Sequence, residues 1–129
     1  MSSVIDILNS KDGLLHGTGA SEQQIQEAQG ELESQFAPDY KEYLLQFAIA
    51  SFEGRELTGI TSSQWVNVVT VTKTERERNP EERKNLYVIE QTNMDDIVYW
   101  QSEEGRVYRT YGIGSPELVY DSFAEYLSE

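Results

Sequence analysis

The chain contains no cysteine and only one histidine, His16, among its 129 residues. The absence of cysteine excludes disulfide bonds, thiolate metal ligands and a cysteine nucleophile. It fits a reducing compartment, so we expect a cytoplasmic protein. A single histidine also leaves few ways to activate a serine or threonine hydroxyl, because such a nucleophile needs a neighbouring base.

Basic residues are scarce as well. The sequence holds 10 Lys and Arg against 23 Asp and Glu, which gives a formal net charge of −13. A negative surface attracts cationic proteins and repels nucleic acids and anionic membranes. We therefore expect a cationic protein partner and neither a nucleic acid nor a membrane. Simple solubility is the alternative explanation of the charge.

Long apolar runs are also missing, and no stretch approaches the roughly 18 residues that a membrane span needs. The first nine residues lack the basic region of a secretion signal. The length predicts a single domain over residues 1–129, and we expect a monomer. Eight Tyr, four Phe and two Trp indicate a folded core, because aromatic side chains bury large areas.

Helical signals dominate the first half of the chain. Ser2 or Ser3 can cap a short helix that carries apolar residues up to Leu8. A capping box at Ser21 starts a helix over residues 21–34. A second helix over residues 38–50 begins at a proline and shows apolar side chains at helical spacing, namely Tyr40, Tyr43, Leu44 and Phe47. We expect these two longer helices to form a hairpin.

The second half has the composition of strands. Segments rich in β-branched and aromatic residues predict strands at 55–60, 65–71, 86–89, 97–100 and 107–111. A charged segment at 73–84 predicts a solvated helix or loop, and a capping box predicts a last helix at 122–127. The expected fold is therefore α+β, with an N-terminal helical hairpin, a mostly antiparallel sheet of five to six strands and a C-terminal helix.

A search for chemistry finds no site that we expect to be catalytic, to hold a cofactor or to bind a metal. His16 with Asp12 supplies too few ligands for zinc, so a loop histidine is the better interpretation. Asp95 and Asp96 with Glu90 lack the ligand spacing of a calcium loop, and a turn between strands is favoured. The bases of segment 73–84 alternate with acids, which argues against a nucleic-acid site.

Residues 36–44 read Phe-Ala-Pro-Asp-Tyr-Lys-Glu-Tyr-Leu. They resemble the helix start "LP-x-x-Y-x-x-F/L-L" of the SUKH superfamily (Smi/Knr-type domains). Residues 86–90 resemble its apolar strand before a turn, and 105–108 and 122–127 complete the pattern. The resemblance covers residues 19–128.

The resemblance implies an α+β domain without catalytic residues. Bacterial members are mostly immunity proteins that bind and neutralise a polymorphic toxin, often a nuclease. Other relatives are regulatory or scaffold domains, which gives the second hypothesis. A small hydrolase that uses a carboxylate pair is the third.

On the first hypothesis, acidic side chains face the cationic cleft of the toxin. We expect these to be Asp95, Asp96, Glu103, Glu104 and Glu117. An exposed aromatic side chain fixes the docking, and the two candidates are Trp100 and Trp65. Burial in the core is the alternative for both tryptophans.

Overall fold

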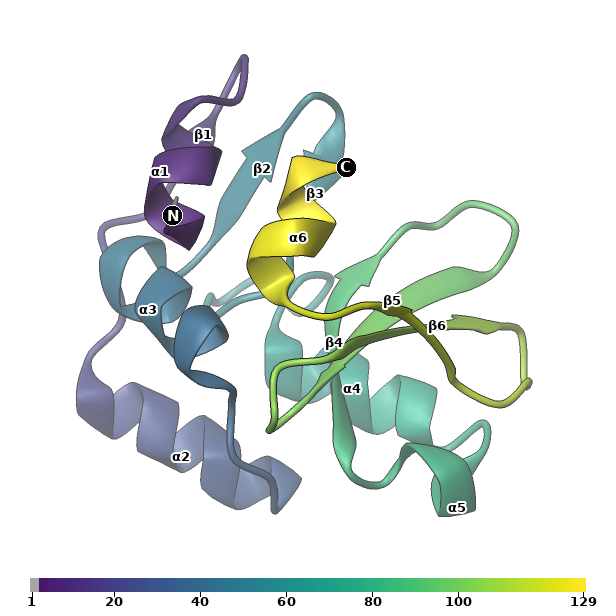
Figure 1. Ribbon diagram of the computed structural model, residues 1–129. Coiled ribbons are helices and arrows are strands. Elements are labelled where there is room, and N and C mark those ends of the chain that lie inside the picture. Colours follow the sequence, from purple (N-terminus) through teal and green to yellow (C-terminus); the bar gives the residue numbers. More distant parts are fainter. Residues whose placement is uncertain (1–2) are drawn as a thin grey trace.

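The computed structural model describes residues 3–129, which form six helices and seven strands (Figure 1). In chain order the elements are α1 (Val4–Asn9), β1 (Leu15–His16), α2 (Glu22–Leu32), α3 (Pro38–Phe47), β2 (Ala50–Phe52), β3 (Arg55–Glu56), α4 (Val68–Arg76), α5 (Pro80–Arg83), β4 (Leu86–Gln91), β5 (Ile97–Ser102), β6 (Val107–Tyr111), β7 (Glu117–Tyr120) and α6 (Phe123–Ser128).

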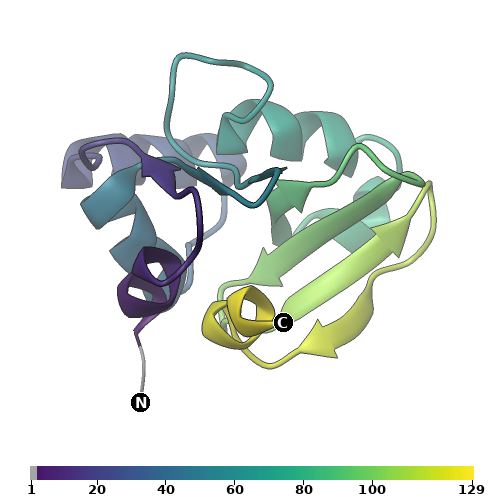
Figure 2. The same cartoon turned by 90° about the horizontal axis from the view of Figure 1, so that it is seen from above.

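The strands form two antiparallel sheets. The larger sheet has the order β4-β5-β6-β7, and the smaller has the order β1-β2-β3. Figure 2 shows α4 and α5 on one side of the larger sheet and α6 on the other. The predicted α+β class and C-terminal helix are confirmed, although the strands are divided between two sheets. Within residues 3–129, no helix is both long enough and apolar enough to cross a membrane.

The predicted N-terminal helices are confirmed with small changes at their ends. Ser3 caps α1 by accepting a hydrogen bond from the Asp6 amide at 3.2 Å, and the alternative cap, Ser2, lies outside the described residues. At the start of α2 both hydrogen bonds of the predicted capping box are present. Helix α3 ends at Phe47 because Ala48 turns into a backbone conformation with φ of 64°.

The strand predicted at 65–71 is wrong, because a helix starts inside it. The side chain of Asn67 accepts hydrogen bonds from the next two free amides, those of Val69 and Thr70, and so caps α4. Buried residues then recur at helical spacing, at Val68, Val71, Thr72 and Glu75. The β-branched residues that suggested a strand are therefore the buried stripe of a helix.

The strand predicted at 55–60 is largely wrong too, because only Arg55–Glu56 pairs with β2. Strands β1, β2 and β7 were not predicted. The first two contain two and three residues, too few to show an alternating pattern. Strand β7 follows the glycines and proline at 112–116 and pairs with β6.

The charged segment 73–84 is not solvated throughout. The Arg83 side chain is completely buried, and its guanidinium lies 5.3 Å from the Trp100 ring centre. The same group donates hydrogen bonds to the carbonyls of Glu75, Gly112 and Gly114 at 2.7–2.9 Å. Arg83 therefore ties the end of α4 to the loop before β7 across one face of the sheet.

Three buried tyrosines join α3 to the larger sheet. The Tyr40 and Tyr43 hydroxyls each lie 2.8 Å from an oxygen of Thr58, whose own hydroxyl donates to the Val88 carbonyl at 2.7 Å. The Tyr87 hydroxyl accepts a hydrogen bond from the Ala37 amide at 2.9 Å. All three phenols are inaccessible to solvent, so each depends on these partners to satisfy its polar atom.

We predict that the protein loses stability in alkali. Burial raises the pKa of Tyr40, Tyr43 and Tyr87 above the ordinary value of 10.0. Below pH 10 the folded and unfolded chains both keep these protons. Above it only the unfolded chain releases them, so the free energy of unfolding falls by up to about 1.4 kcal/mol per pH unit for each tyrosine. Urea unfolding followed by circular dichroism from pH 7 to 11.5 measures this slope.

The variant Tyr43→Phe assigns the slope to a buried phenol. It loses about 1–2 kcal/mol at pH 7, because the Thr58 carbonyl loses a donor, but its stability falls less steeply above pH 10. Tyr111→Phe is the control, because Tyr111 is 52% exposed. An unchanged alkaline slope in Tyr43→Phe would contradict the prediction.

Candidate functional site

Four of the five acidic residues expected at the partner interface lie at opposite ends of one strand. Asp95 and Asp96 precede β5, whereas Glu103 and Glu104 follow it. All four are exposed. The six residues of β5 span about 20 Å, so the two pairs do not form one patch.

Two of the expected acids are already engaged within the chain. Both carboxylate oxygens of Asp96 accept hydrogen bonds from Arg78, at 2.8 and 2.6 Å, and these bonds hold the pKa of Asp96 below its ordinary value. Glu117, at the start of β7, accepts a hydrogen bond from Arg109 at 2.6 Å. A partner that bound either acid would have to compete with a bound guanidinium.

Trp100 cannot anchor a partner, because it is completely buried. Its indole nitrogen donates a hydrogen bond to the Thr110 hydroxyl at 2.9 Å, and its ring packs between α4 and the sheet. The alternative of core burial is therefore confirmed for Trp100. It is wrong for Trp65, which lies in the loop before α4 with 87% of its surface exposed.

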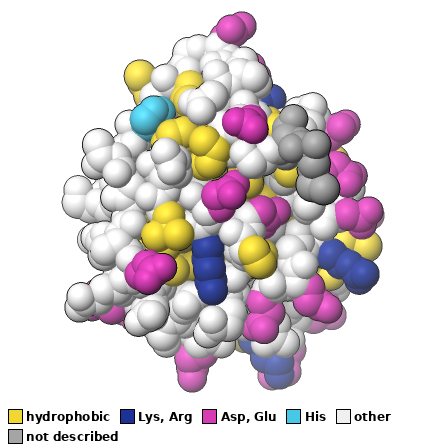
Figure 3. All heavy atoms as spheres, turned by 60° about the vertical axis from the view of Figure 1, so that its left-hand side comes forward, with side chains coloured by type: hydrophobic (Ala, Val, Ile, Leu, Met, Phe, Trp, Pro, Cys, Tyr) yellow, Lys and Arg dark blue, Asp and Glu magenta, His cyan; other side chains and the backbone are white. Residues whose placement is uncertain are grey.

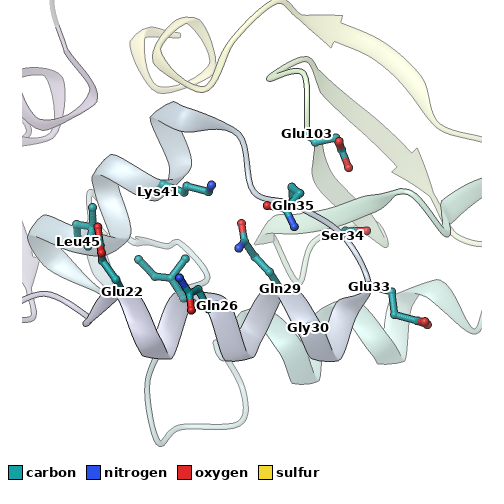
Figure 4. A pocket seen from close by; sticks show the side chains of 11 residues that line it. Glu22, Gln26, Gln29, Gly30, Glu33, Ser34, Gln35, Lys41, Leu45 and Glu103 are labelled. Atoms are coloured by element: carbon teal, nitrogen blue, oxygen red, sulfur yellow. The ribbon is translucent and has the colours of Figure 1, made fainter.

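A groove between α2 and α3 brings one expected residue together with others that were not expected (Figure 4). Its volume is about 630 Å³. Helix α2 turns Ile25, Ala28 and Leu32 towards the core, which leaves its polar residues along the groove. Gln29 connects α2 to the segment before α3, because its side-chain oxygen accepts a hydrogen bond from the Phe36 amide at 2.8 Å.

The charge of this groove is negative. Glu22 lies at one end and Glu33 at the other, and Glu103, on the turn between β5 and β6, also lines the groove (Figure 4). None of these three carboxylates forms an ion pair within residues 3–129. Among the described residues that line the groove, Lys41 is the one basic residue. We call this region, lined by Glu22, Glu33, Glu103 and Lys41, the acidic groove.

Gly30 forms part of the groove in the last turn of α2. A glycine here costs about 0.5–1 kcal/mol relative to alanine, because it loses more backbone freedom on folding. A Cβ built at Gly30 would meet no atom within 4 Å. Within residues 3–129, no contact therefore requires a glycine at this position.

Arg76, which belongs to the charged segment 73–84, holds the C-terminal end of α2 beside the groove. Arg76 of α4 donates hydrogen bonds to the Leu32 carbonyl at 2.7 Å and to the Ser34 hydroxyl at 3.1 Å. Burial lowers the pKa of Arg76, and the nearby charge of Glu33 partly offsets this effect. The predicted helix at 21–34 places Glu22 and Glu33 on one element. Their presence in the same groove as Glu103 depends on tertiary packing.

The negative groove lies on a side of the molecule that carries few basic groups. Figure 3 brings the side with α1, α2 and α3 forward and shows acidic side chains spread over it.

His16, on β1, stacks on Phe47 with ring centres 4.0 Å apart. Residues 3–129 hold no group of three or more His, Asp or Glu side chains placed to bind a metal ion.

A comparison with protein families identifies the chain. A family model described as SUKH_6, SMI1-KNR4 cell-wall, matches residues 22–127. A search of curated proteins found no match. The matched segment runs from the first residue of α2 to the last turn of α6 and so includes both sides of the acidic groove. The chain therefore belongs to the SUKH family.

Proposed function

We propose that this chain is a bacterial immunity protein, which binds a cationic toxin domain in the cytoplasm and blocks its working surface. Membership of the SUKH family is consistent with a toxin-immunity role at the level of the family. The acidic groove is the observation that carries the proposal, because it offers three carboxylates that form no ion pair within residues 3–129. A nuclease toxin supplies the complementary charge, since its cleft binds phosphate.

The proposed mechanism is occlusion without a chemical step. The negative field of the chain steers the toxin towards it, and complementary fields raise the association rate more than the final affinity. Basic side chains of the toxin then pair with Glu22, Glu33 and Glu103 and are no longer available to its substrate. Asp95 and Glu104, exposed and without an ion pair in residues 3–129, add to the field at a distance.

Gly30 supports close approach of the partner in the groove. A missing side chain lets another backbone or a basic side chain lie directly against α2. No contact among the described residues explains this glycine, so we assign it to the interface. Trp65, outside the groove, stays the candidate for an aromatic anchor at a second contact.

Charge reversal in the groove tests the proposal. The toxin is taken to be the product of the neighbouring open reading frame, and the triple variant Glu22→Lys, Glu33→Lys, Glu103→Lys is mixed with it. We expect association to slow by about tenfold or more at low salt and its dependence on salt to weaken. Stopped-flow fluorescence measures the rate, and survival of cells that co-express the toxin measures protection.

The matched control reverses three exposed acids that do not line the groove, Asp12, Glu77 and Glu82. The control changes the net charge equally but should keep most of the rate and all of the protection. Equal loss in both variants would show that only net charge matters, which contradicts the groove. A neighbouring gene that encodes no toxin, with no protection, would favour the regulatory or scaffold hypothesis.

A second test separates folding from binding at Gly30. The variant Gly30→Leu should raise the free energy of unfolding by about 0.5–1 kcal/mol, because leucine favours a helix. It should also weaken toxin binding by at least about tenfold, because the side chain fills the groove. Urea unfolding and calorimetric titration give the two quantities. Gln23→Leu, on the same helix outside the groove, should change binding little, and tight binding by Gly30→Leu would refute the close approach.

A further inference from the structure

A second cavity, lined by tyrosines, lies on different elements from the acidic groove. It has a volume of about 340 Å³ and opens between the turn after β2, the end of β4 and helix α6. Tyr99, Tyr120 and Tyr126 form its aromatic wall. The ring centre of Tyr126 lies 4.8 Å from that of Tyr99 and 5.5 Å from that of Tyr120. We call this site the tyrosine cavity.

A neutralised ion pair forms the base of the tyrosine cavity. Glu90 is 4% exposed and accepts hydrogen bonds from Arg55 at 2.8 and 3.3 Å and from the Tyr126 hydroxyl. The Arg55 guanidinium lies between two rings, 5.1 Å from the centre of Phe52 and 5.3 Å from that of Tyr126. The chain thus already seats one guanidinium against aromatic faces here.

The remaining charge of the lining is negative. Besides the Arg55–Glu90 pair, the charged residues that line the cavity are Glu56 and Glu129. Neither carboxylate has an ion-pair partner in the part of the chain that the structure describes. Met94, 68% exposed, stands at the edge and adds apolar surface. Aromatic residues and methionine are enriched at protein interfaces, so this composition suits a protein partner.

We propose that the tyrosine cavity receives a lysine or arginine side chain presented by a partner protein. The half-buried rings of Tyr99 and Tyr120 offer their negative faces to the cation, and the two free carboxylates supply the opposite charge. An anionic group would meet these carboxylates and be repelled. The inference stands apart from the proposed toxin site, since it involves β3, β4, β5, β7 and α6 and leaves the acidic groove untouched.

The test uses small probes and does not require the natural partner. N-acetyl-arginine amide and N-acetyl-lysine amide are titrated into the full chain while tyrosine ring signals are followed by NMR. We expect saturable shifts confined to Tyr99, Tyr120 and Tyr126, which weaken as salt is raised from 20 to about 300 mM because the attraction is screened. N-acetyl-citrulline amide has a similar shape without the charge and should bind at least about threefold more weakly.

Matched variants locate the binding. Glu56→Gln with Glu129→Gln should weaken the arginine probe by about threefold or more. The control, Glu53→Gln with Glu125→Gln, changes two exposed acids that do not line the cavity. One lies in the turn before β3 and the other in α6, and the control should leave binding unchanged. Equal binding of the citrulline and arginine probes, equal effects of the two variants, or no saturable shift with either cationic probe would overturn the inference. None of these results bears on the toxin test.

Discussion

Helix α3 is held on the larger sheet by hydrogen bonds between buried phenols and Thr58, and the positions of both proposed binding regions depend on this helix. The Thr58 amide donates to the Ile89 carbonyl at 2.9 Å, while its side chain and carbonyl meet Tyr40 and Tyr43. A buried phenol that lost its hydrogen-bond partner would lower the free energy of unfolding by about 1–3 kcal/mol. A shift of α3 along the sheet would therefore be costly.

Asp39, at the start of α3, extends the same constraint to two more elements. Its carboxylate accepts hydrogen bonds from the Gln101 side chain and from the Phe123 amide, each at 3.0 Å. The first bond fixes the end of β5, from which Glu103 reaches the acidic groove. The second fixes the start of α6, which carries Tyr126 into the tyrosine cavity. Both proposed binding regions thus depend on the position of one helix.

The sequence predicted the elements whose signals are local. The capping box at Ser21 and the apolar stripe from Tyr40 to Phe47 are specified within one or two helical turns, and both helices form as expected. Helix α4 was mistaken for a strand because β-branched residues favour strands on average, whereas the cap at Asn67 and burial against β4 decide the outcome here.

The site was less predictable because it depends on contacts between distant residues. Alternation along β5 shows that Tyr99 and Trp100 face opposite sides, but it cannot tell which side a helix covers. Arg83 and α4 cover Trp100, whereas Trp65 lies in the loop before α4 and is exposed. Glu103 was expected at the interface, yet Glu22 and Glu33 are about 70 residues or more away in sequence and line the same groove only in the folded chain.

The central claim is that this chain blocks a cationic toxin by binding alone, through its acidic groove. The most direct measurement is the toxin's activity on its substrate as the purified chain is added in steps, at about 50 and 300 mM salt. The account predicts that activity falls to zero at one equivalent and that more protein is needed at the higher salt. Full toxin activity with excess protein at both salt concentrations would contradict it.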